Sequence, residues 1–295
     1  MITFSAFADE IGPDLDLQMD TCQAQGVRCI DVRGIDNINV SSMTLAQAGQ
    51  YKKRLDDRGF TVPCVGSPLG KIKISDDFDA HLELTRHTCD VAHAFGTDRV
   101  RMFSFYPSGG CDILDQRGEV MDRLARMLEV AERMDAVFYH ENESGIYGSS
   151  PDGVKDIFAT FKTDRLKGIF DPANFVNDGF RPFDDCWQAG LAELTDAFHI
   201  KDKVSGAEGP CVPAGDGDGQ FAEIFGDLAR RSTFRSRATA EDGSLGEGGG
   251  FDDYMTLEPH LAAAGQFKGH TGPELFGKAV AALKKMLDDA GLACR

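Results

Sequence analysis

Short apolar runs alternate with longer amphipathic segments eight times along this 295-residue chain. The runs predict strands over residues 2–8, 28–34, 61–66, 99–105, 136–141, 167–171, 197–201 and 254–258. The other segments predict helices over 14–25, 44–58, 77–95, 116–134, 151–161, around 186–191, 221–231 and 273–290. Strand–helix alternation is typical of parallel α/β proteins. Eight units predict one domain over residues 1–295, a (β/α)₈ TIM barrel, with an open doubly wound sheet as the alternative.

Four consecutive predicted strands end on a residue that can bind a metal ion, namely Glu141, Asp171, His199 and Glu258. Asp171 shows the pattern most clearly, because Pro172 follows it and cannot donate to a sheet ladder. The carboxyl ends of barrel strands meet at one rim, where the active sites of such barrels lie. Three carboxylates gathered there would repel one another without a cation. The sequence therefore predicts a metal site at this rim.

Three carboxylates and one imidazole form a donor set for one divalent ion. We expect Mn²⁺, while Mg²⁺, Co²⁺ or Zn²⁺ would also suit these ligands. Four protein ligands on an octahedral ion leave two positions, which is enough to chelate a hydroxy-ketone. The alternative interpretation is four unrelated polar strand ends, which are common in barrels.

Several polar residues close to predicted strand ends are candidates for substrate binding. These candidates are Arg33, Lys71, Glu143, Asn174 and Lys201. Lys201 either holds a substrate oxygen or pairs with Asp202, and Asn174 either caps a helix or binds substrate. A buried Arg33 needs a carboxylate partner or a ligand. His140 alternates with Glu141 along a strand, so we expect it to point away from the barrel axis.

Charge and composition exclude some partners. Asp and Glu number 48 against 31 Lys and Arg, which gives a net charge of −17 and would repel nucleic acid and anionic lipid. The sequence shows no signal-peptide pattern and no apolar run near the ~20 residues that span a bilayer. Eight cysteines lack Cys-x-x-Cys spacing. We expect a cytoplasmic protein that binds a small molecule, not nucleic acid or a membrane.

Two glycine-rich stretches interrupt the alternation. Residues 206–220 follow the seventh predicted strand, so this loop belongs to the predicted functional rim and could act as a lid. Residues 241–250 precede the eighth strand and are expected to form a flexible insertion at the opposite rim.

Along essentially its whole length the sequence resembles the sugar phosphate isomerase/epimerase family, the xylose-isomerase-like TIM barrels. The resemblance is carried by residues 4–10 (FSAFADE), 66–72 (GSPLGKI), 140–143 (HENE), 170–175 (FDPANF), 199–202 (HIKD), 212–218 (VPAGDGD) and 257–260 (LEPH). That superfamily also contains ketose 3-epimerases, hydroxypyruvate isomerase, inosose dehydratase and endonuclease IV.

The resemblance implies a metal-dependent isomerase or epimerase of carbohydrate metabolism that acts on a sugar, keto-sugar or keto-acid. A proton would be removed next to a carbonyl through a metal-stabilised enediolate, with Glu141 and Glu258 as the acid/base pair. A lyase of the inosose dehydratase type, using the same enolate chemistry, is the alternative. Asn174 stands where epimerases and endonuclease IV carry histidine, which argues against a trinuclear zinc site. A homodimer or homotetramer is left open.

Overall fold

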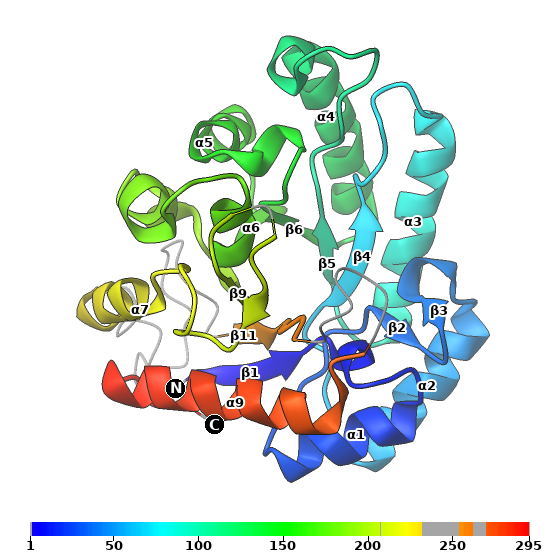
Figure 1. Cartoon of the computed structure of the whole chain (residues 1–295). Helices are drawn as coiled ribbons and strands as arrows, with labels where there is room; N and C mark the ends of the chain where they lie inside the picture. The colour runs from blue at the N-terminus through cyan, green and yellow to red at the C-terminus, as the bar shows by residue number, and fades with distance from the viewer. Residues whose placement is uncertain (1, 207, 232–253, 262–269, 295) are drawn as a thin grey trace, which may run out of the picture.

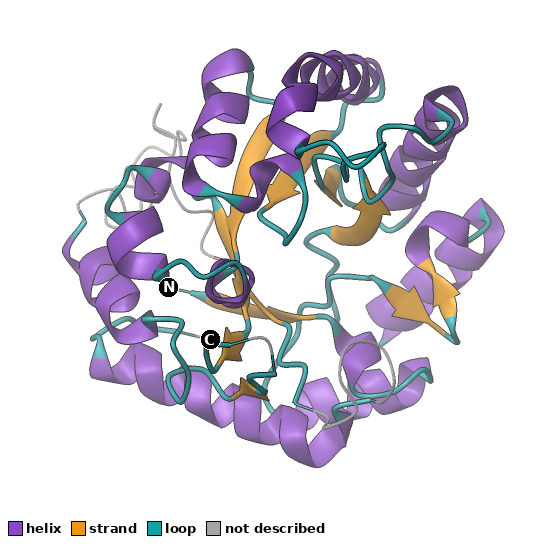
Figure 2. Cartoon of the chain, turned by 45° about the horizontal axis from the view of Figure 1, so that its top comes forward, coloured by secondary structure: helices purple, strands orange, loops and turns teal. Residues whose placement is uncertain are grey.

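The computed structural model describes residues 2–206, 208–231, 254–261 and 270–294. Its main sheet has seven parallel strands in the order β1-β11-β8-β7-β6-β5-β4. The strands are β1 (Thr3–Ala6), β4 (Val65–Leu69), β5 (Arg99–Met102), β6 (Val137–Glu141), β7 (Leu166–Phe170), β8 (Ala197–Ile200) and β11 (Tyr254–Leu257). Because the last strand pairs with the first, the sheet curls round, and the helices lie outside it (Figures 1 and 2).

The segment 28–33 closes the ring between β1 and β4. The backbone N–H of Asp31 donates to the carbonyl of Ala6 at 3.0 Å, and that of Gly66 donates to the carbonyl of Val32 at 2.8 Å. This segment therefore takes the place of the second of eight strands. The fold is the predicted (β/α)₈ barrel.

The second unit is less regular than the predicted strand 28–34. It forms isolated bridges, one from Cys29 to Thr61 and one from Val32 to Val65. Pro63 lies between these two partners and has no N–H for the ladder, so regular pairing is interrupted there. The chain then makes a small hairpin of β2 (Gly34–Ile35) and β3 (Ile38–Asn39).

The outer helices begin at side-chain caps that the sequence supplies. The Thr44 hydroxyl accepts from the N–H of Gln47, whose side chain accepts from the N–H of Thr44 in return. Asp14, Asp77 and Ser150 cap three other helices. The long helices are α1 (Leu15–Ala24), α2 (Leu45–Asp57), α3 (Phe78–Ala94), α4 (Arg117–Arg133), α5 (Pro151–Thr160), α7 (Phe221–Arg230) and α9 (Gly272–Asp289).

The sixth unit differs from the prediction. A short helix, α6 (Pro172–Asn177), starts directly after β7, because Asp171 caps it and proline suits a first helical position. In place of the helix expected around 186–191, the chain has a π-helical segment, Pro182–Trp187, followed by a 3₁₀ turn, Leu191–Leu194.

Aromatic side chains on one face of the strands pack against the outer layer. Phe170 of β7 and Phe198 of β8 lie 5.5 and 5.6 Å from Trp187 between ring centroids. Trp187 is buried and donates its indole N–H to Asp227 at 2.8 Å, so it belongs to this core. The opposite face of the strands points into the barrel, where the interior is polar: the Arg99 guanidinium lies 5.7 Å from the ring of Tyr139 and 5.6 Å from that of Tyr254.

The rim loop 206–220 is described except for residue 207, and the predicted insertion 241–250 lies outside the described residues. No helix among the described residues has the length and apolar character needed to cross a bilayer.

Candidate metal centre

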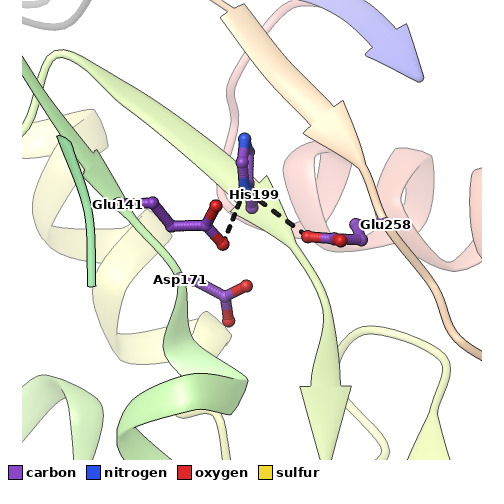
Figure 3. Close-up of side chains that lie close together, drawn as sticks. All are labelled: Glu141, Asp171, His199 and Glu258. Atoms are coloured by element: carbon purple, nitrogen blue, oxygen red, sulfur yellow. Dashed lines mark ion pairs between the residues drawn. The ribbon is translucent and has the colours of Figure 1, made fainter. Parts of the chain in front are cut away.

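The four residues predicted as metal ligands come together at the carboxyl ends of four adjacent strands. Glu141 ends β6, Asp171 follows β7, His199 lies in β8, and Glu258 follows β11. One ligand atom from each lies within 4.8 Å of the others, and all four residues are at most 4% exposed. Figure 3 shows the four side chains directed toward a common point.

The contacts within this cluster run between the imidazole and two carboxylates. Nδ1 of His199 lies 3.0 Å from Oε1 of Glu141 and 3.5 Å from Oε2 of Glu258. Burial acts to raise the pKa of Glu141, but His199 and Arg101 outweigh it and lower the value to about 2. Burial and the neighbouring carboxylates raise the pKa of Asp171 to about 7, although Lys201 opposes this shift. The carboxylates of this cluster thus depend on nearby positive charges, such as those of Arg101 and Lys201, to remain ionised.

Three buried atoms of the cluster make no hydrogen bond of regular geometry among the described residues, although each lies within 3.5 Å of a side chain that can form an ion pair with it. They are Oδ2 of Asp171, Nδ1 of His199 and Oε2 of Glu258. Buried polar atoms without a hydrogen bond are costly. All three are lone-pair donors when His199 is neutral at Nδ1, so a divalent cation would satisfy them together. The residues present therefore fit a divalent metal ion.

Lys201 pairs with Asp171 instead of its neighbour Asp202. Its ammonium lies 2.9 Å from Oδ2 of Asp171 and 3.8 Å from Oε2 of Glu258. The sequence alternative of a Lys201–Asp202 pair is wrong, because Asp202 accepts four backbone N–H groups: those of Lys203 and of three glycines of the rim loop, Gly215, Gly217 and Gly219. A Cβ on Gly217 would lie 2.5 Å from Oδ1 of Asp202, so the loop needs glycine there.

Each of the two glutamates also accepts a hydrogen bond from an arginine. Arg33 donates to Oε1 of Glu258 at 2.7 Å and to Asp9 at 2.8 Å. Arg101 donates to Oε2 of Glu141 at 3.1 Å and to two backbone carbonyls, those of Gly66 and Ser67. Arg33, a candidate for substrate binding, therefore directs its donors at protein carboxylates.

Asn174 lies beside Glu141. Its side-chain amide donates to the carbonyl of Asn142 at 2.8 Å and to Oε1 of Glu141 at 3.4 Å. The capping role weighed for Asn174 belongs to Asp171, whose Oδ1 accepts from the backbone N–H of Asn174 at 3.0 Å. Asn174 is thus in the first turn of α6, held against the ligand set.

Lys71 and Glu143 form an ion pair of 2.5 Å at the side of the cluster, and both are partly exposed. The ammonium of Lys71 also lies 4.2 Å from the centre of the Phe103 ring. Burial acts to lower the pKa of Lys201, but Asp171, Glu258 and Glu143 raise it well above its usual value. Glu143 therefore links the Lys71 pair electrostatically to the ligand cluster.

Sequence reasoning missed one residue of the site, Glu10, which contacts His260 just past the last predicted strand. Nε2 of His260 lies 2.8 Å from Oε1 of Glu10 and 3.4 Å from Oε1 of Glu258. Burial acts to lower the pKa of His260, but hydrogen bonds and these carboxylates raise it to about 11. Glu10, His260 and Glu258 also have the spacing of a metal site. Arg33, however, lies 3.5 Å from Glu10 and already neutralises this second group.

The sequence did hold a signal for Glu10, because it comes shortly after the first strand, on the side of the barrel where the carboxyl ends of the strands and the four ligands lie. His140, in contrast, points out of the barrel as predicted from alternation. It is buried, lies 3.0 Å from the Ser104 hydroxyl, and burial lowers its pKa to about 4.

A family model described as a xylose isomerase-like TIM barrel matches residues 19–276 of this chain. No curated protein sequence matches it. Among solved structures, the probable 3-DHS dehydratase AsbF involved in petrobactin synthesis from Bacillus anthracis is 16% identical with a TM-score of 0.69, covering 96% of this chain and 99% of that one. A D-tagatose 3-epimerase-like protein is 15% identical with a TM-score of 0.69, covering 98% of both chains. The IOLI protein with a bound zinc atom is 15% identical with a TM-score of 0.69, covering 99% of this chain and 98% of that one.

Proposed function

This chain belongs to the xylose isomerase-like TIM barrel family, and from that premise we propose that it is a divalent-metal-dependent isomerase or epimerase of a sugar or keto-acid. The observation that carries the proposal is the buried cluster of Glu141, Asp171, His199 and Glu258, whose ligand atoms lie within 4.8 Å of one another. Buried carboxylates at such distances need positive charge, which Lys201 supplies in part and which a metal ion would supply at the point that the four side chains face.

These four residues would hold one divalent ion, with Mn²⁺ as our first choice. When bound, the ion supplies positive charge that polarises a substrate carbonyl and stabilises an enediolate. The rest of the chemistry belongs to the protein. Glu141 and Glu258 stand on either side of His199, so one carboxylate can take a proton from the substrate carbon while the other returns one.

Burial supports this assignment of the two glutamates. Both are almost completely removed from water, and each has one oxygen held by an arginine and the other directed inward. An oriented carboxylate loses little freedom when substrate arrives, which favours proton transfer. Arg33 and Arg101 are thus proposed to hold the glutamates rather than bind substrate.

We propose that Lys201, Asn174 and the Lys71–Glu143 pair contact the substrate. Lys201 and Asn174 each lie against a ligand carboxylate, at the edge of the space that the four ligands face. The Lys71–Glu143 pair is partly exposed, so a hydroxyl group can exchange with one partner. Both partners are already neutralised by each other, which favours a hydroxylated neutral substrate over a phosphorylated one.

The test is a panel of ketoses, keto-acids and inososes incubated with the Mn²⁺-loaded protein in D₂O. Deuterium at a carbon next to the carbonyl, without loss of water, is the expected result, and the chelator-treated protein is the control. Loss of water after the same exchange would assign the protein to the lyases instead. A metal-loaded protein that exchanges no substrate proton in any member of the panel would contradict the proposal.

A further inference from the structure

Two arginines converge on one aromatic ring next to the ligand cluster. The guanidinium carbon of Arg33 lies 4.8 Å from the centroid of the Phe7 ring, and that of Arg101 lies 4.7 Å from the same centroid. This ring and the His199 imidazole form a T-shaped pair, with centroids 5.0 Å apart and planes at 79°. Phe7 follows β1 and is 1% exposed. One buried ring therefore touches three groups of the site.

Each of these arginines holds a different glutamate. Arg33 donates to Oε1 of Glu258 and Arg101 donates to Oε2 of Glu141. The other oxygen of each glutamate, Oε2 of Glu258 and Oε1 of Glu141, is the one that faces His199. Which oxygen each glutamate presents to the centre is therefore set by where its arginine lies.

The Phe7 ring packs closely against the backbone at Gly66, where a side chain would collide with it. A Cβ on Gly66 would lie 2.4 Å from Cε1 of Phe7 and 3.1 Å from Cβ of Arg33. The carbonyl of Gly66 also accepts from Nη2 of Arg101 at 3.1 Å. The ring and both arginines are thus packed against one glycine, and they have little freedom to move independently.

We propose that Phe7 is a positioning residue for both glutamates, because its ring fixes the two guanidinium groups that orient them. This inference rests on the proposed function in one respect. It assumes that the metal ion binds, and the proton is transferred, at the point that the two glutamates face. Two like charges near one ring are tolerable because each guanidinium has a carboxylate partner, and the ring adds a cation–π attraction to each. An aliphatic side chain of similar bulk would fill the space without that attraction, and both glutamates could turn.

The first experiment compares Phe7→Leu with Phe4→Leu, which changes an equally buried phenylalanine within β1. Loss of groups that orient metal ligands costs about 10–100-fold in metal affinity. We therefore expect Phe7→Leu to raise the Mn²⁺ dissociation constant at least tenfold and to shift the visible absorption spectrum of the Co²⁺-loaded protein. Phe4→Leu should leave both close to the parent. A parent-like affinity and spectrum in Phe7→Leu would overturn the proposal.

The second experiment needs no metal, so it separates this inference from the proposed function. A double-mutant cycle of Phe7→Leu and Arg101→Met, which removes the cation, is followed by urea unfolding of the metal-free protein. A shared cation–π contact predicts non-additive changes, a few-fold to about thirtyfold in the unfolding equilibrium constant. Additive changes would overturn the proposal even if the parent binds metal, whereas a parent that binds no metal would refute the proposed function alone. Phe7→Met, which also fills the space, replaces Phe7→Leu if that variant does not fold.

Discussion

The ammonium of Lys201 lies 2.9 Å from Oδ2 of Asp171, so a protein cation is already placed among the ligands proposed for a metal ion. Lys201 is 7% exposed, and its second neighbour is Oε2 of Glu258 at 3.8 Å. Both oxygens belong to the set that would bind the metal. Lys201 therefore stabilises the metal-free site and competes for the same carboxylates.

Replacing Lys201 by methionine should separate these two effects. Removal of one partner from a buried ion pair costs about 3–5 kcal/mol, so the free energy of unfolding of the metal-free protein should fall by that order. Mn²⁺ should then raise the melting temperature of Lys201→Met more than that of the parent. Lys203→Met is the control, since Lys203 donates to the carbonyl of Gly209 and not to a ligand. Equal responses of Lys201→Met and the parent to Mn²⁺ would contradict this interpretation.

Metal removal should destabilise the protein through linkage. A ligand at 100 times its dissociation constant adds about 2.7 kcal/mol to the free energy of unfolding, so Mn²⁺ should raise the melting temperature of chelator-treated protein. His199→Ala should abolish this rise. His140→Ala should keep it while lowering stability, because His140 lies on the outward face of β6. The reverse pattern in the two variants would mean that the strand faces are assigned incorrectly.

Glu141 and Glu258 are expected to divide the proton transfer between them. Glu141→Gln and Glu258→Gln should each lower turnover by about 10²–10⁴-fold or more, the range for general acid–base steps. Each variant should still exchange a substrate proton with solvent on the side of its intact glutamate. Deuterium incorporation from both epimers, measured once the D₂O panel identifies a substrate, distinguishes the two. Parent-like turnover in either variant would remove that glutamate from the mechanism.

Stability should fall in acid because His81 is buried in its neutral form. Its Nε2 accepts from the N–H of Gly70 at 2.9 Å, while burial and the nearby Arg123 lower its pKa to about 4. The folded protein then binds fewer protons than the unfolded chain between pH 6.5 and 4, so this contribution is present above pH 6.5 and is lost toward pH 4. The loss should approach about 3 kcal/mol.

The measurement for His81 is the urea midpoint as a function of pH. In His81→Gln the amide oxygen can accept from Gly70 without titrating, so the decline between pH 6.5 and 4 should become shallower. Exposed His93→Gln should leave the decline unchanged. A parallel pH profile for His81→Gln and the parent would show that other groups cause the acid loss.

The sequence by itself determined the barrel and the neighbourhood of the ligands. Strand–helix alternation is a local pattern, and it predicted parallel strands whose carboxyl ends share a rim. Glu141, Asp171, His199 and Glu258 could be grouped because each ends one of four consecutive strands, and these strands are adjacent in the sheet. The orientation of His140 could likewise be predicted from two-residue periodicity.

Only the tertiary structure decided which side chains pair across the barrel. Arg33 and Glu258 are separated by 225 residues, yet their side chains are in hydrogen-bond contact, and Lys201 contacts Asp171 rather than the adjacent Asp202. Local periodicity assigns a residue to an element and a face. The partner that it meets there depends on the relative register of distant strands and on the packing of residues such as Phe7 and Gly66 between them. Strand register and side-chain packing depend on contacts between segments that are distant in the sequence, so a pattern within one segment cannot predict them.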